Sequence, residues 1–186
     1  RYHGVVLCAL GWACWKTYLG RQEADELRSA AMNVLGKGLS DAKRHEDALV
    51  VKEAELSMLR RVGASEESML VAQSNLALTY QQLRRLQDAL RIQRDVYSEY
   101  VKLNGEEHEK TLRAANNYAS SLIRLEHFEE ARSLLRKMIP VARRVLREEN
   151  DLTLKMRWLS ARALYADRVA TLDDLREAVT TLEDAQ

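Results

Sequence analysis

The chain has 186 residues, which corresponds to one domain of ordinary size and allows a substantial buried core. Hydrophobic residues make up 46% and charged residues 31%, with 29 Lys and Arg against 28 Asp and Glu, so this is the composition of a folded protein with balanced charge. A protein that binds nucleic acid or an anionic membrane through bulk charge is more basic, and neither partner is expected.

Glycine and proline are scarce, with 7 Gly and 1 Pro. Average usage of about 7% and 5% would give roughly 13 and 9. Sandwiches, barrels and other loop-rich folds need more turn residues than this. The strong helix formers Ala, Leu, Arg and Glu dominate instead, so the sequence predicts an all-α protein.

The N-terminal segment, residues 1–29, contains an apolar run of about twelve residues from Gly4 to Trp15. This run is shorter than the ~20 residues that span a bilayer, so we expect a buried helix and connector that cap the rest of the chain. An oligomer contact and a membrane or targeting element are the alternatives. Because the first residue is Arg1 and not Met, we expect the chain to be a piece of a longer protein.

Two cysteines lie in this segment, Cys8 and Cys14, six residues apart. That spacing places them on different faces of a helix, so no disulfide is expected between them. The absence of a disulfide framework favours a reducing, cytoplasmic setting.

An internal repeat of 41 or 42 residues follows. Asn75-Leu76-Ala77 recurs as Asn117-Tyr118-Ala119, and Asp88-Ala89 recurs as Glu130-Ala131, each at a shift of 42. A copy around Leu35–Leu39 lies 41 residues upstream, and a fourth begins near Leu159-Ser160-Ala161. Such a period indicates structural units that stack on one another.

Each copy has the apolar spacing of a helical hairpin, with a first helix, helix A, and a second, helix B. A small residue recurs in both helices, and two facing small side chains let antiparallel helices approach closely. Pro140, inside the third helix B, predicts a kink and not a break. The small residues are Gly36, Ala77, Ala119 and Ala161 in helix A, and Ala48, Ala89 and Ala131 in helix B. We expect hairpins at 30–68, 69–110, 111–152 and 153–186, the last with its helix B around Arg176-Glu177-Ala178.

The repeat resembles the tetratricopeptide repeat, specifically the kinesin-light-chain type. The segments that carry the likeness are Gly105-Glu106-Glu107-His108-Glu109-Lys110-Thr111-Leu112, Asn116-Asn117-Tyr118-Ala119 and His127-Phe128-Glu129-Glu130-Ala131. The resemblance covers roughly residues 30–186 and implies a right-handed superhelical solenoid of antiparallel helical hairpins, here with an N-terminal capping helix. It further implies a non-catalytic adaptor or scaffold that binds a peptide or partner protein on the concave surface lined by the A helices.

In this family an Asn of helix A often grips the peptide backbone, because an amide offers both a donor and an acceptor. Asn75 and Asn117, two residues before Ala77 and Ala119, match that position. Counting from the same small residues gives further candidates that face the groove. The basic ones among them favour an acidic segment or a C-terminal carboxylate as the ligand. The alternative is that all of these, the two asparagines included, are ordinary solvent-facing residues. The further candidates are Lys37, Gln82, Arg113, Arg124 and Arg162.

No catalytic or metal-binding pattern accompanies the repeat. His3, His45, His108 and His127 are scattered, and His108 and His127 fall at turns between helices, where packing or capping is expected. Gly36-Lys37-Gly38-Leu39-Ser40 lacks the preceding strand and the spacing of a phosphate loop. We therefore expect no enzyme, no metal and no cofactor. Two alternative functions remain, an oligomerising subunit that uses the N-terminal Trp-rich helix and a regulatory repeat array of a multidomain enzyme.

Overall fold

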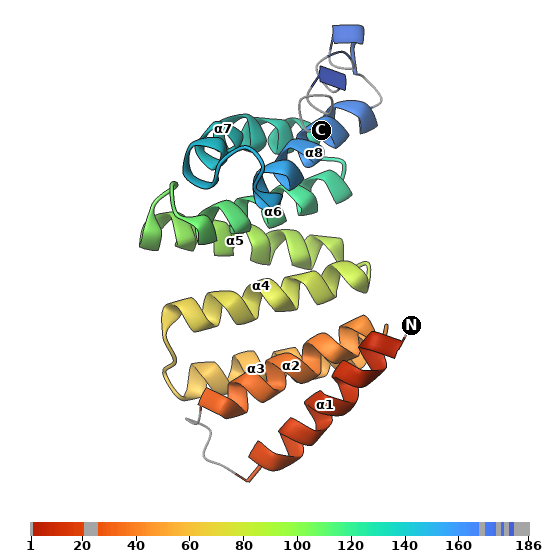
Figure 1. Cartoon of the computed structure of the whole chain (residues 1–186), viewed down its shortest axis with the longest axis vertical. Helices are drawn as coiled ribbons and strands as arrows, with labels where there is room; N and C mark the ends of the chain where they lie inside the picture. Colours follow the sequence, from red (N-terminus) through yellow and green to blue (C-terminus); the bar gives the residue numbers. More distant parts are fainter. Residues whose placement is uncertain (1, 21–25, 168–169, 174–175, 177–178, 181–186) are drawn as a thin grey trace. The chain divides into compact units, whose positions relative to one another are not determined.

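The computed structural model describes residues 2–20, 26–167, 170–173, 176 and 179–180, and within these residues the chain forms eight α-helices and no strand (Figure 1). The all-α prediction is confirmed. The predicted helix B of the fourth hairpin, at Glu177 and Ala178, lies outside the described residues. The helices are α1 (Tyr2–Tyr18), α2 (Glu26–Asp41), α3 (His45–Arg61), α4 (Glu66–Gln82), α5 (Leu86–Asn104), α6 (Glu109–Arg124), α7 (Phe128–Leu146) and α8 (Asp151–Ala166).

The helices fall into two compact units, Arg1–Ala89 and Leu90–Gln186, with the boundary in the first turn of α5. In the first unit α2 packs against both α1 and α3, and α3 packs against α4. In the second unit α6 and α7 pack together, and α8 packs against both of them. Each unit therefore contains the predicted arrangement of neighbouring helices that share a core.

The A helices of the repeat are α2, α4, α6 and α8, and the B helices are α3, α5 and α7. The turns from helix A to helix B share one backbone geometry. Lys43, Arg84 and Glu126 stand at equivalent places with φ of 62°, 61° and 62°, a left-handed conformation that usually favours glycine. The next residue in each turn donates its N–H to the carbonyl five residues earlier, at 2.9 to 3.0 Å. This bond ends helix A and starts helix B within a few residues, so a hairpin forms without glycine.

Polar side chains begin three of the helices. The hydroxyl of Ser65 accepts from the N–H of Ser68 at 3.2 Å and caps α4. His108 Nδ1 accepts from the N–H of Lys110 at 3.2 Å and caps α6, which confirms the predicted capping role of this histidine. Asn150 caps α8 in the same way, so these helix starts follow from local sequence.

All seven small residues of the repeat are buried, as the hairpin prediction requires. Ala48, Ala77, Ala89, Ala119 and Ala131 are fully buried, and large apolar side chains surround them. α7 is a continuous helix with Pro140 inside it, so the proline does not break it.

The first helix packs against α2 in the first unit. Residues 21–25 of the predicted connector lie outside the described residues. Gly11 lies so close to α2 that an added Cβ would be 2.6 Å from Leu35 Cα. Trp15 packs against the cluster that contains Cys8 and Leu35, and both cysteines are free thiols. In the part of the chain that the structure describes, no helix combines the length and apolar character needed to cross a membrane.

Candidate functional site

The two repeated asparagines have the same local environment. Asn75 in α4 and Asn117 in α6 are both half-buried. The backbone carbonyl of Asn75 accepts from Thr79 Oγ1 at 3.3 Å, and that of Asn117 accepts from Ser121 Oγ at 3.2 Å. In each unit a buried hydroxyl four residues later therefore bonds to the backbone carbonyl of the asparagine.

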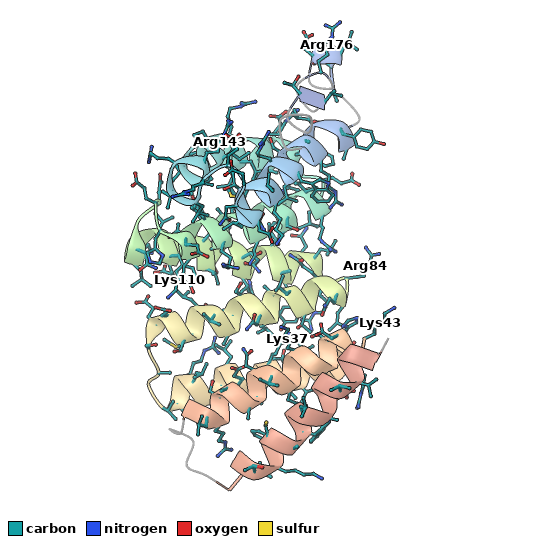
Figure 2. All side chains as sticks on the ribbon, viewed as in Figure 1. Lys37, Lys43, Arg84, Lys110, Arg143 and Arg176 are labelled. Atoms are coloured by element: carbon teal, nitrogen blue, oxygen red, sulfur yellow. The ribbon has the colours of Figure 1, made fainter. Side chains whose placement is uncertain are left out.

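The other predicted site residues are all exposed, and two of them have partners on the same helix. Arg113 donates to Glu109 at 2.6 Å, which neutralises part of its charge, and Arg162 lies over the Trp158 ring at 5.4 Å. The structure places Lys37, Asn75 and Gln82 in the first unit, and Arg113, Asn117, Arg124 and Arg162 in the second. Lys37 is labelled on α2 in Figure 2.

A buried lysine that was not among the predicted residues lies behind Asn75. Lys52 of α3 is 7% exposed, and its ammonium donates to Thr79 Oγ1 at 2.7 Å, Ser40 Oγ at 3.2 Å and the Asn75 carbonyl at 3.3 Å. These three acceptors use all three N–H donors of the ammonium. Desolvation lowers the pKa of Lys52, and Glu55 and Asp41 oppose that change through their negative charges.

The aliphatic stem of Lys52 explains the glycine of the first hairpin. A Cβ added at Gly36 would lie 3.1 Å from Lys52 Cγ and 3.2 Å from its Cε. The equivalent small residues of the other hairpins are Ala77, Ala119 and Ala161. The long side chain on α3 therefore takes the space that a methyl group occupies elsewhere.

A second buried charged residue, Glu55, lies one turn further along α3. It is 3% exposed, its Oε1 accepts from Ser29 Oγ at 3.2 Å, and its Oε2 has no hydrogen-bond partner among the described residues. Burial raises the pKa of Glu55 to about 7, although the hydrogen bond from Ser29, the nearby amide of Asn33 and the charge of Lys52 act in the opposite direction.

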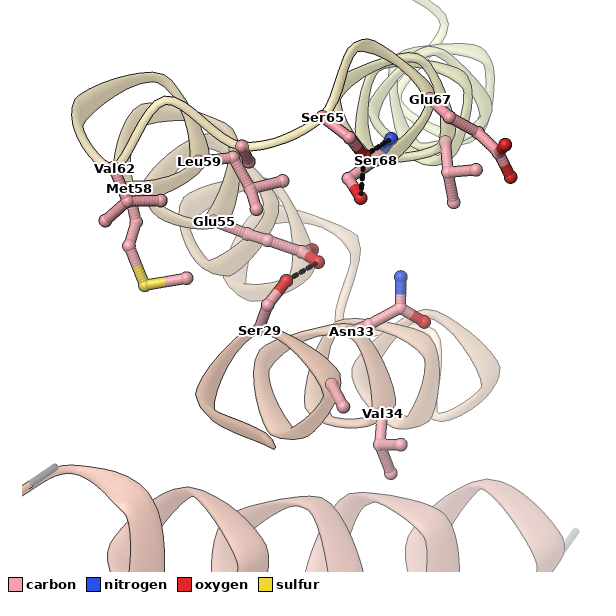
Figure 3. A pocket seen from close by; sticks show the side chains of 13 residues that line it. Ser29, Asn33, Val34, Glu55, Met58, Leu59, Val62, Ser65, Glu67 and Ser68 are labelled. Atoms are coloured by element: carbon pink, nitrogen blue, oxygen red, sulfur yellow. Dashed lines mark hydrogen bonds between the residues drawn. The ribbon is translucent and has the colours of Figure 1, made fainter. Parts of the chain in front are cut away.

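Glu55 lies at the side of an open cleft of about 780 Å³ between α2, α3 and α4 (Figure 3). The apolar part of the lining includes Val34, Leu59 and Val71, which belong to these three helices in turn. The cleft is thus contained in the first unit and combines apolar walls with a carboxyl group. Its polar lining consists of Ser29, Asn33, Glu55, Ser65, Glu67 and Ser68.

The repeat itself carries the signal for these two residues. Shifts of 41 and then 42 align Lys52 with Gln93 and Leu135, and Glu55 with Val96 and Met138. All of the aligned side chains are buried. At these two buried positions the first hairpin has charged residues, whereas the two following copies have uncharged ones, so the first hairpin differs from them.

Among the described residues there is no group of three or more His, Cys, Asp or Glu side chains that could hold a metal ion.

Residues 68–144 match the family model described as tetratricopeptide repeat. No curated protein matches the chain. Among solved structures, the chain is similar to a kinesin-light-chain-like protein of Podospora anserina with nearly identical TPR-like repeats. The two share 23% identity, with 98% of this chain and 83% of the other covered and a TM-score of 0.74. It is also similar to BtubC (BKLC) from P. vanneervenii, at 14% identity, 99% and 74% coverage and a TM-score of 0.74. The predicted resemblance to tetratricopeptide repeats of the kinesin-light-chain type is confirmed at the level of the fold.

Proposed function

We propose that this chain, as an array of tetratricopeptide repeats, binds an extended peptide segment of a partner protein on the surface formed by its A helices. It acts as an adaptor or scaffold and carries out no catalysis. Repeats of this kind typically have no catalytic role, and the binding surface they offer is built from side chains of several helices.

The observation that carries the proposal is the repeated asparagine. Asn75 and Asn117 stand at the same repeat position, each half-buried, and a buried hydroxyl bonds to the carbonyl of each. The side-chain amide of an asparagine can accept from a peptide N–H and donate to a peptide carbonyl at once. Because the asparagine recurs in successive repeats, it suits an extended peptide, whose backbone N–H and carbonyl groups also recur along its length.

Exposed positive groups support an acidic segment or a C-terminal carboxylate as the ligand. Lys37 and Arg124 are exposed side chains at repeat positions counted toward the same surface. Arg113 contributes less, because Glu109 already accepts from it at 2.6 Å. Gln82 and Arg162 complete the proposed contact set. The free thiols of Cys8 and Cys14 agree with a reducing, cytoplasmic setting.

The test is capture of peptides from a displayed random library by the full chain and by the Asn75→Ala, Asn117→Ala double variant. We expect the double variant to bind the captured peptides at least about tenfold more weakly, since two amide contacts of about 1 kcal/mol each are lost. Asn104→Ala, which changes an exposed asparagine at the end of α5, is the matched control. Unchanged binding by the double variant, with an intact helical spectrum, would contradict the proposal.

A second candidate function, assembly through α1, is supported by the apolar outer face of that helix. Val5, Val6 and Leu10 are 60%, 53% and 55% exposed, and Trp12 is 42% exposed. Light scattering over a range of concentrations tests it, with Leu10→Lys as the variant. A mass that rises with concentration in the parent and not in the variant supports assembly, and a constant monomer mass rejects it.

A further inference from the structure

We propose that the cleft between α2, α3 and α4 receives a lysine or arginine side chain of the partner protein, with the cationic group at Glu55. This inference rests on the proposed function and specifies the chemistry of the ligand where it meets the A helices of the first unit. The A-helix residues Asn33, Val34 and Val71 line the cleft, so a segment lying on the A helices passes over it.

The charge of the lining supports a cation. Of the described residues that line the cleft, two carry carboxyl groups, Glu55 and Glu67, and none is a lysine, arginine or histidine. Glu67 is exposed in the first turn of α4, whereas Glu55 is 3% exposed. The cleft therefore has one exposed carboxyl group and one buried carboxyl group in its lining.

The hydrogen bonding of Glu55 is incomplete. Its Oε1 accepts from Ser29 at 3.2 Å, while its Oε2 is buried and has no partner among the described residues. A buried carboxylate oxygen without a donor costs free energy, which an ammonium or guanidinium N–H would recover. Figure 3 shows Glu55 reaching from α3 toward Ser29, with Asn33 beside it.

Lys52 cannot supply this donor. Its ammonium lies against Thr79, Ser40 and the carbonyl of Asn75, and these three bonds occupy its donors. Its charge therefore compensates Glu55 only at a distance, and burial keeps the pKa of the carboxyl group near 7. A cation bound at Oε2 would lower that pKa and favour the ionised form.

The walls of the cleft fit the rest of a lysine or arginine side chain. Val34, Leu59 and Val71 are apolar and lie on three different helices around the opening. The methylene stem of lysine or arginine buries along apolar surface while its head group makes polar contacts. A glutamate side chain would bring a third carboxyl group into the cleft.

The experiment uses three blocked pentapeptides, acetyl-Ala-Ala-X-Ala-Ala-amide, in which X is lysine, norleucine or glutamate. Each is titrated into the full chain near pH 8, and the methyl NMR signals of Met58 and Val71, both in the lining, report binding. We expect the lysine peptide to shift these signals and to bind about tenfold more tightly than the norleucine peptide, because only lysine offers a charged donor. Equal or weaker binding of the lysine peptide, stronger binding of the glutamate peptide, or no shift with any of them would overturn the inference.

Variants locate the contact. Glu55→Gln keeps an acceptor for Ser29 and removes the charge, so the preference for lysine over norleucine should disappear. Glu67→Gln, at an exposed position in the first turn of α4, should reduce that preference in part. Glu46→Gln, an exposed glutamate at the other end of α3, is the matched control and should change nothing. A lysine preference that survives in Glu55→Gln rejects the inference.

The outcome is separable from that of the proposed function. Lysine-peptide binding at the cleft together with unimpaired library capture by the Asn75, Asn117 double variant would reject the asparagine contacts and leave the cation site standing. Asparagine-dependent capture without a lysine preference would do the opposite.

Discussion

The first and third hairpins use the same backbone frame to bury opposite chemistry. In the α2/α3 hairpin, Lys52 and Glu55 are 7% and 3% exposed. In the α6/α7 hairpin the aligned residues are Leu135 and Met138, both fully buried in one apolar cluster. The helix lengths and the turns are nearly the same in both.

The difference extends to the residues around each position. Lys52 donates to Ser40 and Thr79. The residues that align with these two around Leu135 are Ile123 and Ala163, which have no hydrogen-bonding side chain. The small residues and turns therefore fix the hairpin, whereas a charge is buried only where neighbouring helices supply acceptors.

The largest expected loss of stability comes from placing a lysine in the third hairpin without the acceptors that Lys52 has in the first. Leu135→Lys places an ammonium among apolar groups, and we expect it to lower the free energy of unfolding by about 3–5 kcal/mol. Urea denaturation followed by circular dichroism measures the change. Leu135→Met conserves volume and should cost less than about 1.5 kcal/mol. A loss below that control value in Leu135→Lys would show that the third hairpin tolerates a charge as well as the first.

A smaller change in the free energy of unfolding is expected when the buried carboxyl group of the first hairpin is replaced by an amide. The pKa of Glu55 is raised from 4.5 to about 7 in the folded chain, so the folded state holds the proton more tightly than the unfolded state. Ionisation therefore destabilises the parent as pH rises from about 4.5 through 7, with roughly 3 kcal/mol as the upper limit. Glu55→Gln should gain stability relative to the parent between pH 5 and pH 8.

Urea denaturation at both pH values measures this difference between Glu55→Gln and the parent. The exposed Glu46→Gln substitution on the same helix is the control, and its difference from the parent should not depend on pH. If the Glu55→Gln difference were equally flat, the carboxyl group would not be held at a raised pKa.

The smallest expected change in stability concerns the left-handed turn residue that the two hairpins share. Lys43 and Glu126 both have φ of 62° in the turn from helix A to helix B. Replacing either residue by glycine removes the left-handed strain, and we expect a gain of about 0.5–1 kcal/mol in each case. Thermal denaturation of Lys43→Gly and Glu126→Gly measures it. A gain in one hairpin and a loss in the other would mean that the turns are not equivalent.

Most of the fold could be predicted from the sequence, but less of the site could. The positions of Ala77, Ala119 and Ala131 and the capping role of His108 follow from spacing and local residue type. Asn75 and Asn117 could be chosen because they recur. The cleft around Glu55 could not be chosen in this way, because no motif of adjacent residues marks it.

By itself, the sequence determined the helices, the hairpin repeat and the buried small residues, since each depends on periodicity or on contacts a few residues apart. The tertiary structure alone decided which groups Lys52 and Glu55 contact and that a cleft opens beside them. The partners responsible are Ser29, 26 residues before Glu55, and Thr79, 27 residues after Lys52. Whether a charged side chain on a helix meets water or a hydrogen-bonding group depends on which distant helices pack over it, and local residue pattern does not contain that information.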